Sequence, residues 1–197
     1  QPSSVIVQYD GDVDPTTEGW TKNGTEDATS DGSRLRITDD GGSWAMFEYN
    51  DNVNLAATEN CGILARAKVV SQDANTEGYR GYIYLRAGTE TAGAVSMELG
   101  NATDAESNFG PMLTSSGNSV VGTIESSPDN TSYQWFYVAW DPDTDMYKMG
   151  VLGLDYSWTM STSALATSLS DASSVGFGSY ATNDATTDWD TVIAFNW

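Results

Sequence analysis

Short segments with alternating apolar and polar residues recur along all 197 residues of the chain, and Gly, Asp, Asn and Ser separate them. Most are rich in β-branched or aromatic residues, which is the pattern of half-buried strands. The pattern predicts strands near 5–9, 33–39, 43–50, 62–72, 79–87, 93–100, 119–124, 133–141, 146–154, 174–181 and 189–197. No segment has a helical period, apart from one expected helical turn at 163–169. We therefore expect an all-β fold, with one domain over residues 1–197 and two antiparallel sheets packed as a sandwich or jelly roll.

Two polar segments are typical of tight connections between neighbouring strands. Residues 39–42 read Asp-Asp-Gly-Gly and residues 141–145 read Asp-Pro-Asp-Thr-Asp. These residue types favour turns, because Gly and Asp tolerate unusual backbone angles and Pro fixes one of them. The sequence therefore predicts a hairpin at each segment.

Alternation in the segment at 79–87 separates a core face from a polar face. The core face carries apolar or small residues, namely Tyr79, Gly81, Ile83, Leu85 and Ala87. The other face carries Arg80, Tyr82, Tyr84 and Arg86. Arginine pairs well with carboxylate or sulfate, and tyrosine stacks on sugar rings. This second face is therefore a candidate ligand site.

Six of the eight basic residues occur as pairs on strand faces. These pairs are Arg34 with Arg36, Arg66 with Lys68, and Arg80 with Arg86. One interpretation is cross-strand ion pairing, with Glu48 and Glu98 as candidate partners. The other is a groove in which Arg and Tyr hold an oxygen-rich or anionic ligand.

The net charge of −20, from 28 acidic and 8 basic residues, narrows the range of partners. It disfavours nucleic acids and anionic lipids, because affinity for phosphate comes from Lys and Arg. No apolar run is long enough to span a membrane, so we expect no membrane insertion. The acids are mostly Asp and only three residues are Lys. This balance is typical of marine or halophilic proteins, although an ordinary acidic secreted domain would also show it.

The chain has no histidine and a single cysteine, Cys61. The missing histidine excludes a Ser-His-Asp triad and histidine-ligated metals. A single cysteine cannot form an intramolecular disulfide, and Cys61 begins an apolar segment. We expect it to be a buried core residue rather than a nucleophile.

Several motifs, in their order along the chain, resemble the concanavalin A-like lectin/glucanase superfamily, and laminin G-like modules in particular. They are Asp10-Gly11, Gly19-Trp20, Leu35-x-Ile37, Gly62–Val69, the aromatic strand and Asp-containing hairpin at 135–145, Gly150 with Gly153, and Trp189-Asp-Thr-Val-Ile193. The resemblance covers nearly the whole chain. It implies a two-sheet antiparallel jelly-roll sandwich of concanavalin A-like type, with one concave sheet.

The resemblance also implies a structural calcium ion (Ca²⁺) between the N-terminal region and the final strand. Its ligands here would include Asp190 of the closing motif and Asp10 or Asp12 of the early acidic segment. Calcium takes six to eight oxygen ligands, which such segments supply. The segment lacks the Gly and Glu positions of an EF-hand loop, and alternate aspartates also form turns without a metal.

Three functional classes follow from these observations. The first is a non-catalytic carbohydrate-binding, lectin-like module of an extracellular or surface protein. Its ligand would be a glycan or polysaccharide, including anionic ones, and its site would use Arg80, Tyr82, Tyr84 and Arg86, with Trp44 or Trp158 as stacking platforms. The second is a structural or adhesion domain of a surface or virion appendage.

The third class is a polysaccharide lyase or glycosidase. The Glu-x-Asp-x-x-Glu run of glycosidases with this fold is missing, so an enzyme would need an atypical Tyr/Arg or carboxylate site. Asp188 and Asp190 have the spacing of a carboxylate pair, but their expected role is structural. We therefore favour the binding module and assign no catalytic residues.

Overall fold

The structure is a computed structural model, and it describes residues 4–39, 43–49, 61–72, 81–87, 94–99, 110–114, 118–120, 132–141, 146–152, 157–161, 172–181 and 185–196. Within these ranges lie fifteen strands and one short 3-10 helix, η1. Their bounds are β1 Ser4–Tyr9, η1 Pro15–Glu18, β2 Thr21–Asn23, β3 Asp27–Ser30, β4 Leu35–Asp39, β5 Ser43–Tyr49, β6 Cys61–Gln72, β7 Gly81–Ala87, β8 Ala94–Leu99, β9 Gly110–Thr114, β10 Asn118–Val120, β11 Gln134–Asp141, β12 Met146–Val151, β13 Ser157–Ser161, β14 Ala172–Ala181 and β15 Ala185–Asn196.

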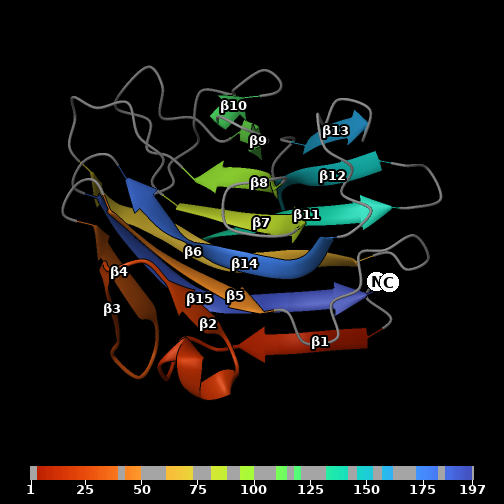
Figure 1. Ribbon diagram of the computed structural model, residues 1–197. Helices are drawn as coiled ribbons and strands as arrows, with labels where there is room; N and C mark the ends of the chain where they lie inside the picture. The colour runs from red at the N-terminus through yellow and green to blue at the C-terminus, as the bar shows by residue number, and fades with distance from the viewer. Residues whose placement is uncertain are drawn as a thin grey trace.

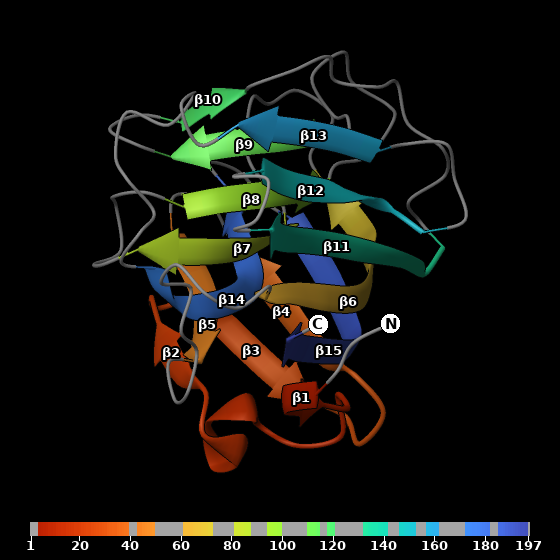
Figure 2. The same cartoon turned by 90° about the vertical axis from the view of Figure 1, so that its right-hand side faces the viewer.

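The strands form two antiparallel sheets, which Figure 2 shows as two layers. The eight-stranded sheet has the order β13-β12-β11-β6-β15-β4-β3, and β1 also pairs with β15. The seven-stranded sheet has the order β10-β9-β8-β7-β14-β5-β2. Because β1 and β15 run antiparallel, Ser4 pairs with Asn196, and the start of β1 lies beside the end of β15 in Figure 1.

The predicted all-β, two-sheet architecture is confirmed, and one predicted hairpin is wrong. Residues 141–145 connect β11 to β12, where Asp141 pairs with Met146. Residues 39–42 do not make a hairpin, because β4 belongs to the eight-stranded sheet and β5 to the seven-stranded sheet. The prediction also missed β2, β3, β9 and β13. The helical turn expected at 163–169 lies outside the described residues.

The inner faces of the two sheets enclose an aromatic core centred on Phe177 of β14. Its ring centroid lies 5.5 Å from that of Phe47, 5.1 Å from Trp20 and 5.1 Å from Trp189. Cys61 is fully buried in the same core, as the sequence predicted. Burial of such large side chains supplies most of the driving force for packing the sheets together. Among the described residues, no helix has the length and apolar character needed to span a bilayer.

Candidate functional site

The outer face of the seven-stranded sheet is formed by alternate residues of its strands. Phe47, Phe177 and Ile83 point into the core, so the residues between them point outward. Gly176 of β14 pairs with Glu48 of β5 on one side and with Tyr84 of β7 on the other. Glu48, Gly176 and Tyr84 therefore form one row across the middle of this face.

Tyr84 lies across Gly176 and reaches the strand beyond it. A Cβ atom added to Gly176 would lie 2.1 Å from Tyr84 Cζ, so only glycine leaves room for the ring. The Tyr84 hydroxyl donates a hydrogen bond of 2.9 Å to Glu48 Oε1, and Asn23 Nδ2 donates one of 3.3 Å to Glu48 Oε2. The three side chains tie β7, β5 and β2 together. They leave an acidic, hydrogen-bonded centre on this face.

Gly178, two residues further along β14, lies close to the backbone of β5 and to the Met46 side chain. A Cβ atom at Gly178 would lie 2.8 Å from Met46 Sδ, so the thioether lies over the glycine. Met46 is consequently buried although it belongs to an outward-facing position. Because Gly176 and Gly178 have no side chains, the side chains of Tyr84 and Met46 occupy the space above β14.

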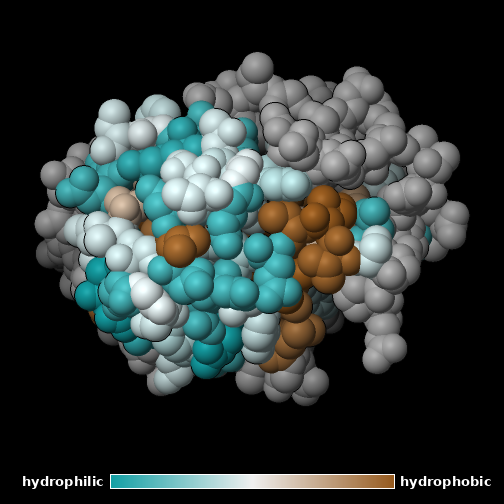
Figure 3. Space-filling view, turned by 90° about the horizontal axis from the view of Figure 1, so that it is seen from below, coloured by the Kyte–Doolittle hydropathy of each residue, from teal (hydrophilic) through white to brown (hydrophobic). Residues whose placement is uncertain are grey.

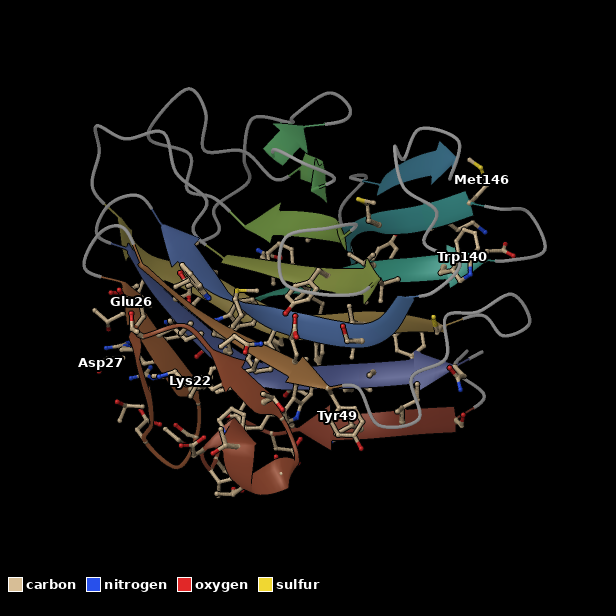
Figure 4. The ribbon with its side chains drawn as sticks, in the orientation of Figure 1. Lys22, Glu26, Asp27, Tyr49, Trp140 and Met146 are labelled. Carbon is tan, nitrogen blue, oxygen red and sulfur yellow. The ribbon has the colours of Figure 1, made fainter. Side chains whose placement is uncertain are left out.

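Trp44 extends this face toward the β2–β3 turn and keeps 37% of its surface exposed. The turn packs directly on it: Glu26 N–H donates to the Trp44 carbonyl at 3.2 Å, and a Cβ at Gly24 would lie 2.5 Å from Trp44 Cδ1. Lys22 Nζ closes the turn by donating to the Glu26 carbonyl at 2.7 Å. Figure 4 shows Lys22 and Glu26 at this end of the molecule, far from Trp140 and Met146 at the β11–β12 hairpin.

The sequence-predicted binding residues have different outcomes. Tyr84 is on the predicted face but only 2% exposed, so its ring does not offer a free stacking surface. Tyr82 pairs with Gly178 and Arg86 with Ser174 in the β7–β14 register, and the side chains of both lie outside the described part of the structure. Trp158 belongs to β13 of the eight-stranded sheet, where it pairs in register with the buried Met149. It is therefore not part of the predicted face. Arg80 lies outside the described residues.

The pairs Arg34/Arg36 and Arg66/Lys68 meet on the opposite side of the molecule, on the outer face of the eight-stranded sheet. There Arg34, Arg36 and Lys68 surround Asp188 of β15, whose side chain is fully buried. Arg36 binds it through two hydrogen bonds of 2.7 and 2.9 Å, and these raise the pKa of Arg36 most. Arg34 and Lys68 approach Asp188 Oδ2 at 3.3 and 3.8 Å.

Cross-strand ion pairing is therefore confirmed for these four bases, with acids other than those predicted. Arg66 pairs with Asp190, and its guanidinium lies 4.7 Å from the centre of the Tyr133 ring. Lys68 Nζ lies 4.8 Å from the same ring. We call these seven residues, Arg34, Arg36, Arg66, Lys68, Tyr133, Asp188 and Asp190, the Asp188 cluster.

Two of the segments predicted to hold calcium, the early acidic segment and the last strand, lie next to each other. A Cβ at Gly11 would lie 2.7 Å from the Asp190 carbonyl oxygen, so the early acidic segment packs against the last strand. The carboxylates have other partners, however: Asp10 accepts from Gln8 at 2.6 Å and Asp190 pairs with Arg66. Within the described ranges, no group of three or more acidic or cysteine residues converges as a metal site, and calcium binding by Asp10, Asp12 and Asp190 remains a prediction.

The rest of the early acidic segment forms a turn and a helix cap. Asp14 caps η1 by accepting from the backbone N–H of Thr16 at 2.9 Å and from its hydroxyl at 2.8 Å. Glu18 ends η1, and burial, together with Asp12 and Asp10, raises its pKa. The Asp14 carboxylate is therefore part of local backbone structure.

Comparison with known proteins gives the fold a name. Neither a protein-family model nor a curated protein sequence matches the chain significantly. Solved structures do match. An endo-1,3-beta-glucanase from Streptomyces sioyaensis superposes with a TM-score of 0.68 at 13% identity, covering 100% of this chain and 98% of the other. The chain has the concanavalin A-like jelly-roll fold.

Two further structures share this concanavalin A-like fold with the chain. The metal-free carbohydrate recognition domain of Emp46p matches with a TM-score of 0.66 at 9% identity, over 92% of this chain and 91% of that one. The CBM2 module of the Dit protein of Lactobacillus casei phage J-1 matches with a TM-score of 0.64 at 14% identity, over 100% and 97%. At these identities the likeness defines the fold alone.

Sequence reasoning missed several residues that build the site. Gly176 and Gly178 are separated by one residue within a strand, and this spacing is itself a signal that neighbouring side chains cross the strand. Asn23 belongs to a strand of three residues, which is too short for periodicity to detect. Asp188 was not missed, since its spacing to Asp190 singled it out with a structural role, but only pairing with β4 and β6 reveals its cationic neighbours.

Proposed function

We propose that this protein is a non-catalytic carbohydrate-binding module of an extracellular or surface protein, and that glycan binds to the outer face of its seven-stranded sheet. The observation that carries this proposal is Trp44. This indole is more than one-third exposed and is held in place by the Gly24–Glu26 turn. On the same face, four residues further along β5, the Glu48 carboxylate accepts a hydrogen bond from the Asn23 amide. An aromatic platform with nearby polar groups suits a sugar, which has an apolar face and a hydroxyl rim.

The strand positions of Glu48 and Glu98 favour binding over hydrolysis. Glu98 of β8 pairs with Tyr82 of β7, so it lies three strands from Glu48 of β5. At about 4.8 Å per strand, the backbones of Glu48 and Glu98 are roughly 14 Å apart. Glycosidase carboxylates lie about 5 Å apart in retaining enzymes and up to about 9.5 Å in inverting ones. Asp188 and Asp190 also have the spacing of a carboxylate pair, but Arg36 binds the first and Arg66 binds the second.

The burial of Tyr84 also argues against a lyase that uses it as the base. Its hydroxyl already donates to Glu48, and its ring is covered. A tyrosine base must reach a proton of the substrate. Tyr84 instead holds Glu48 in position.

A glycan array compares the wild type with Trp44→Ala and, as a control, Val13→Ala. Val13 is 38% exposed, almost the same as Trp44 at 37%, and lies in the early acidic segment. We expect wild type and Val13→Ala to bind the same glycans, and Trp44→Ala to bind them about tenfold more weakly or worse. Unchanged binding by Trp44→Ala would show that glycan does not bind at the proposed site. No binding by a folded wild type would favour the structural or adhesion role instead.

A further inference from the structure

The Asp188 cluster carries more positive charge than its buried carboxylate requires. Four of the chain's eight basic residues meet there, in a protein of net charge −20. Asp188 and Asp190 neutralise two of the four cations. Asp31, on the adjoining turn, also pairs with Arg34 at 3.1 Å. Within the described residues, one positive charge is left over after these three acids are counted.

The cations form the outer layer of this cluster, and the acid lies beneath them. The Asp188 side chain is 0% exposed, whereas those of the four basic residues are between 23% and 40% exposed. A ligand that approaches this face therefore meets ammonium and guanidinium groups first. The Lys68 ammonium makes no hydrogen bond within the described part of the chain; its nearest carboxylate oxygen is 3.8 Å away. Its donors remain available to an incoming anion.

Aromatic side chains stand directly beside these cations. Trp135 of β11 is opposite Arg66 in the β11–β6 register, and Tyr137 is opposite Leu64. Both aromatic residues are half-buried, and so is Tyr133, which contacts Arg66 and Lys68. The face therefore combines anion-binding groups with ring surfaces that suit the apolar side of a sugar.

We propose that the outer side of the Asp188 cluster is a second binding site, which takes the carboxylate or sulfate group of an acidic sugar. The anion pairs with Lys68 and with the outer edges of Arg34 and Arg66, while the sugar ring packs beside Trp135. A bare inorganic ion would use only the cations. Nucleic acid is disfavoured, because the surrounding acidic surface repels a polyanion. This site lies on the sheet opposite Trp44 and does not depend on the function proposed for that face.

The test is calorimetric titration of the full chain at constant ionic strength. The probes are a hyaluronan tetrasaccharide, a chondroitin sulfate tetrasaccharide, uncharged cellotetraose and inorganic sulfate. We expect saturable binding of at least one acidic tetrasaccharide, at least tenfold tighter than cellotetraose or sulfate. Failure of both acidic probes to bind would overturn the proposal, and equal binding of sulfate would reduce the site to one for a free ion.

Lys68→Gln and Lys148→Gln form a matched pair of variants. Lys148 is also on the eight-stranded sheet, 49% exposed, and pairs with Asp141 at 3.4 Å. Each substitution removes one positive charge, and Lys68→Gln leaves both Arg36–Asp188 hydrogen bonds intact. We expect Lys68→Gln to weaken the acidic ligand about five- to tenfold and Lys148→Gln less than twofold. Equal losses would mean that only overall charge matters.

Trp44→Ala separates this site from the one on the seven-stranded sheet. We expect it to leave binding of the acidic tetrasaccharide unchanged. Loss of that binding in Trp44→Ala would place the ligand on the other face and overturn the proposal.

Discussion

Single residues on the two outer faces derive their roles from neighbours across the sheet. Gly176 is required because Tyr84 crosses it, and Asp188 is buried because three cations approach it. Alternation along a strand predicted that Tyr84 faces outward, which the structure confirms. It did not predict that Tyr84 is covered, because nothing in the local sequence reveals which residue lies opposite. The identity of the cross-strand partner decides whether an outward-facing side chain offers an exposed surface to a ligand, as Trp44 does, or is covered and holds a neighbouring side chain in place, as Tyr84 does.

Substitution of Gly176 tests the role of the Tyr84 ring. Gly176→Ala would place a methyl group 2.1 Å from Tyr84 Cζ, so the ring must move. This movement would break the hydrogen bond from the Tyr84 hydroxyl to Glu48. We expect a loss of about 1–3 kcal/mol in the free energy of unfolding, measured by urea denaturation. The double variant Gly176→Ala/Tyr84→Val removes the clash and should recover part of this loss. A Gly176→Ala protein as stable as wild type would show that the ring does not need the glycine.

A second pair of variants tests the burial of Asp188. Asp188→Asn leaves three cations close together without their shared carboxylate, and we expect a cost of about 3–5 kcal/mol. Asp190→Asn removes a partly exposed partner of Arg66 and should cost about 1 kcal/mol or less. Thermal unfolding of both variants checks the difference. Equal effects would contradict the central position of Asp188.

At the scale of elements, the long strands were predictable and their pairing was not. The predicted strands at 62–72 and 133–141 nearly coincide with β6 and β11, because their alternation extends over many residues. The hairpin predicted at 39–42 failed because turn chemistry specifies a turn but not the sheet that receives the next strand. β2, β3 and β9 are only three to five residues long, which is too short for a period to show.

The first strand shows how a register shift changes the exposed face. Val5 pairs with Phe195 and Val7 with Ala194, with a shift between them. Val5 is exposed, whereas Val7 packs against the core, although simple alternation would put both on one face. Figure 3 shows apolar atoms gathered on this underside of the molecule, where β1 lies at the edge of its sheet. The shift lets β1 present apolar side chains both inward and outward.

This register predicts unequal effects of the same substitution at two neighbouring positions. Val7→Lys would force an ammonium group toward the core, and we expect a loss of about 2–3 kcal/mol in the free energy of unfolding. Val5→Lys places the charge in solvent and should change stability by less than about 0.5 kcal/mol. Urea denaturation of both variants measures the difference. Similar losses would indicate that β1 has no register shift.

At the scale of the whole molecule, the charges are distributed unevenly. Four of eight bases are concentrated on one sheet face, while 28 acids give the chain its net charge of −20. Such a charge destabilises the compact state through self-repulsion, and salt screens it. The sequence was sufficient to foresee this repulsion, because it depends on composition. It was not sufficient to locate the basic face, because that depends on which strands become neighbours.

We therefore expect the melting temperature to rise with salt. An increase from about 10 mM to about 1 M NaCl shortens the screening length from about 30 Å to about 3 Å. A gain of about 1–2 kcal/mol would raise the melting temperature by roughly 2–8 °C for a chain of this size. Differential scanning fluorimetry measures this rise. A melting temperature that falls with salt would show that local ion pairs such as Arg36–Asp188 outweigh the overall repulsion.

The most direct test of glycan binding on the seven-stranded sheet is to locate the ligand by methionine-methyl NMR. Met46 lies on that face over Gly178, whereas Met149 is fully buried in β12 of the other sheet. A glycan that the array identifies as Trp44-dependent is titrated into ¹³C-methyl-methionine protein. We expect the Met46 methyl signal to shift in a saturable way and the Met149 signal to stay in place. An unmoved Met46 signal, at ligand concentrations that saturate binding, would contradict the assignment of this face as the glycan site.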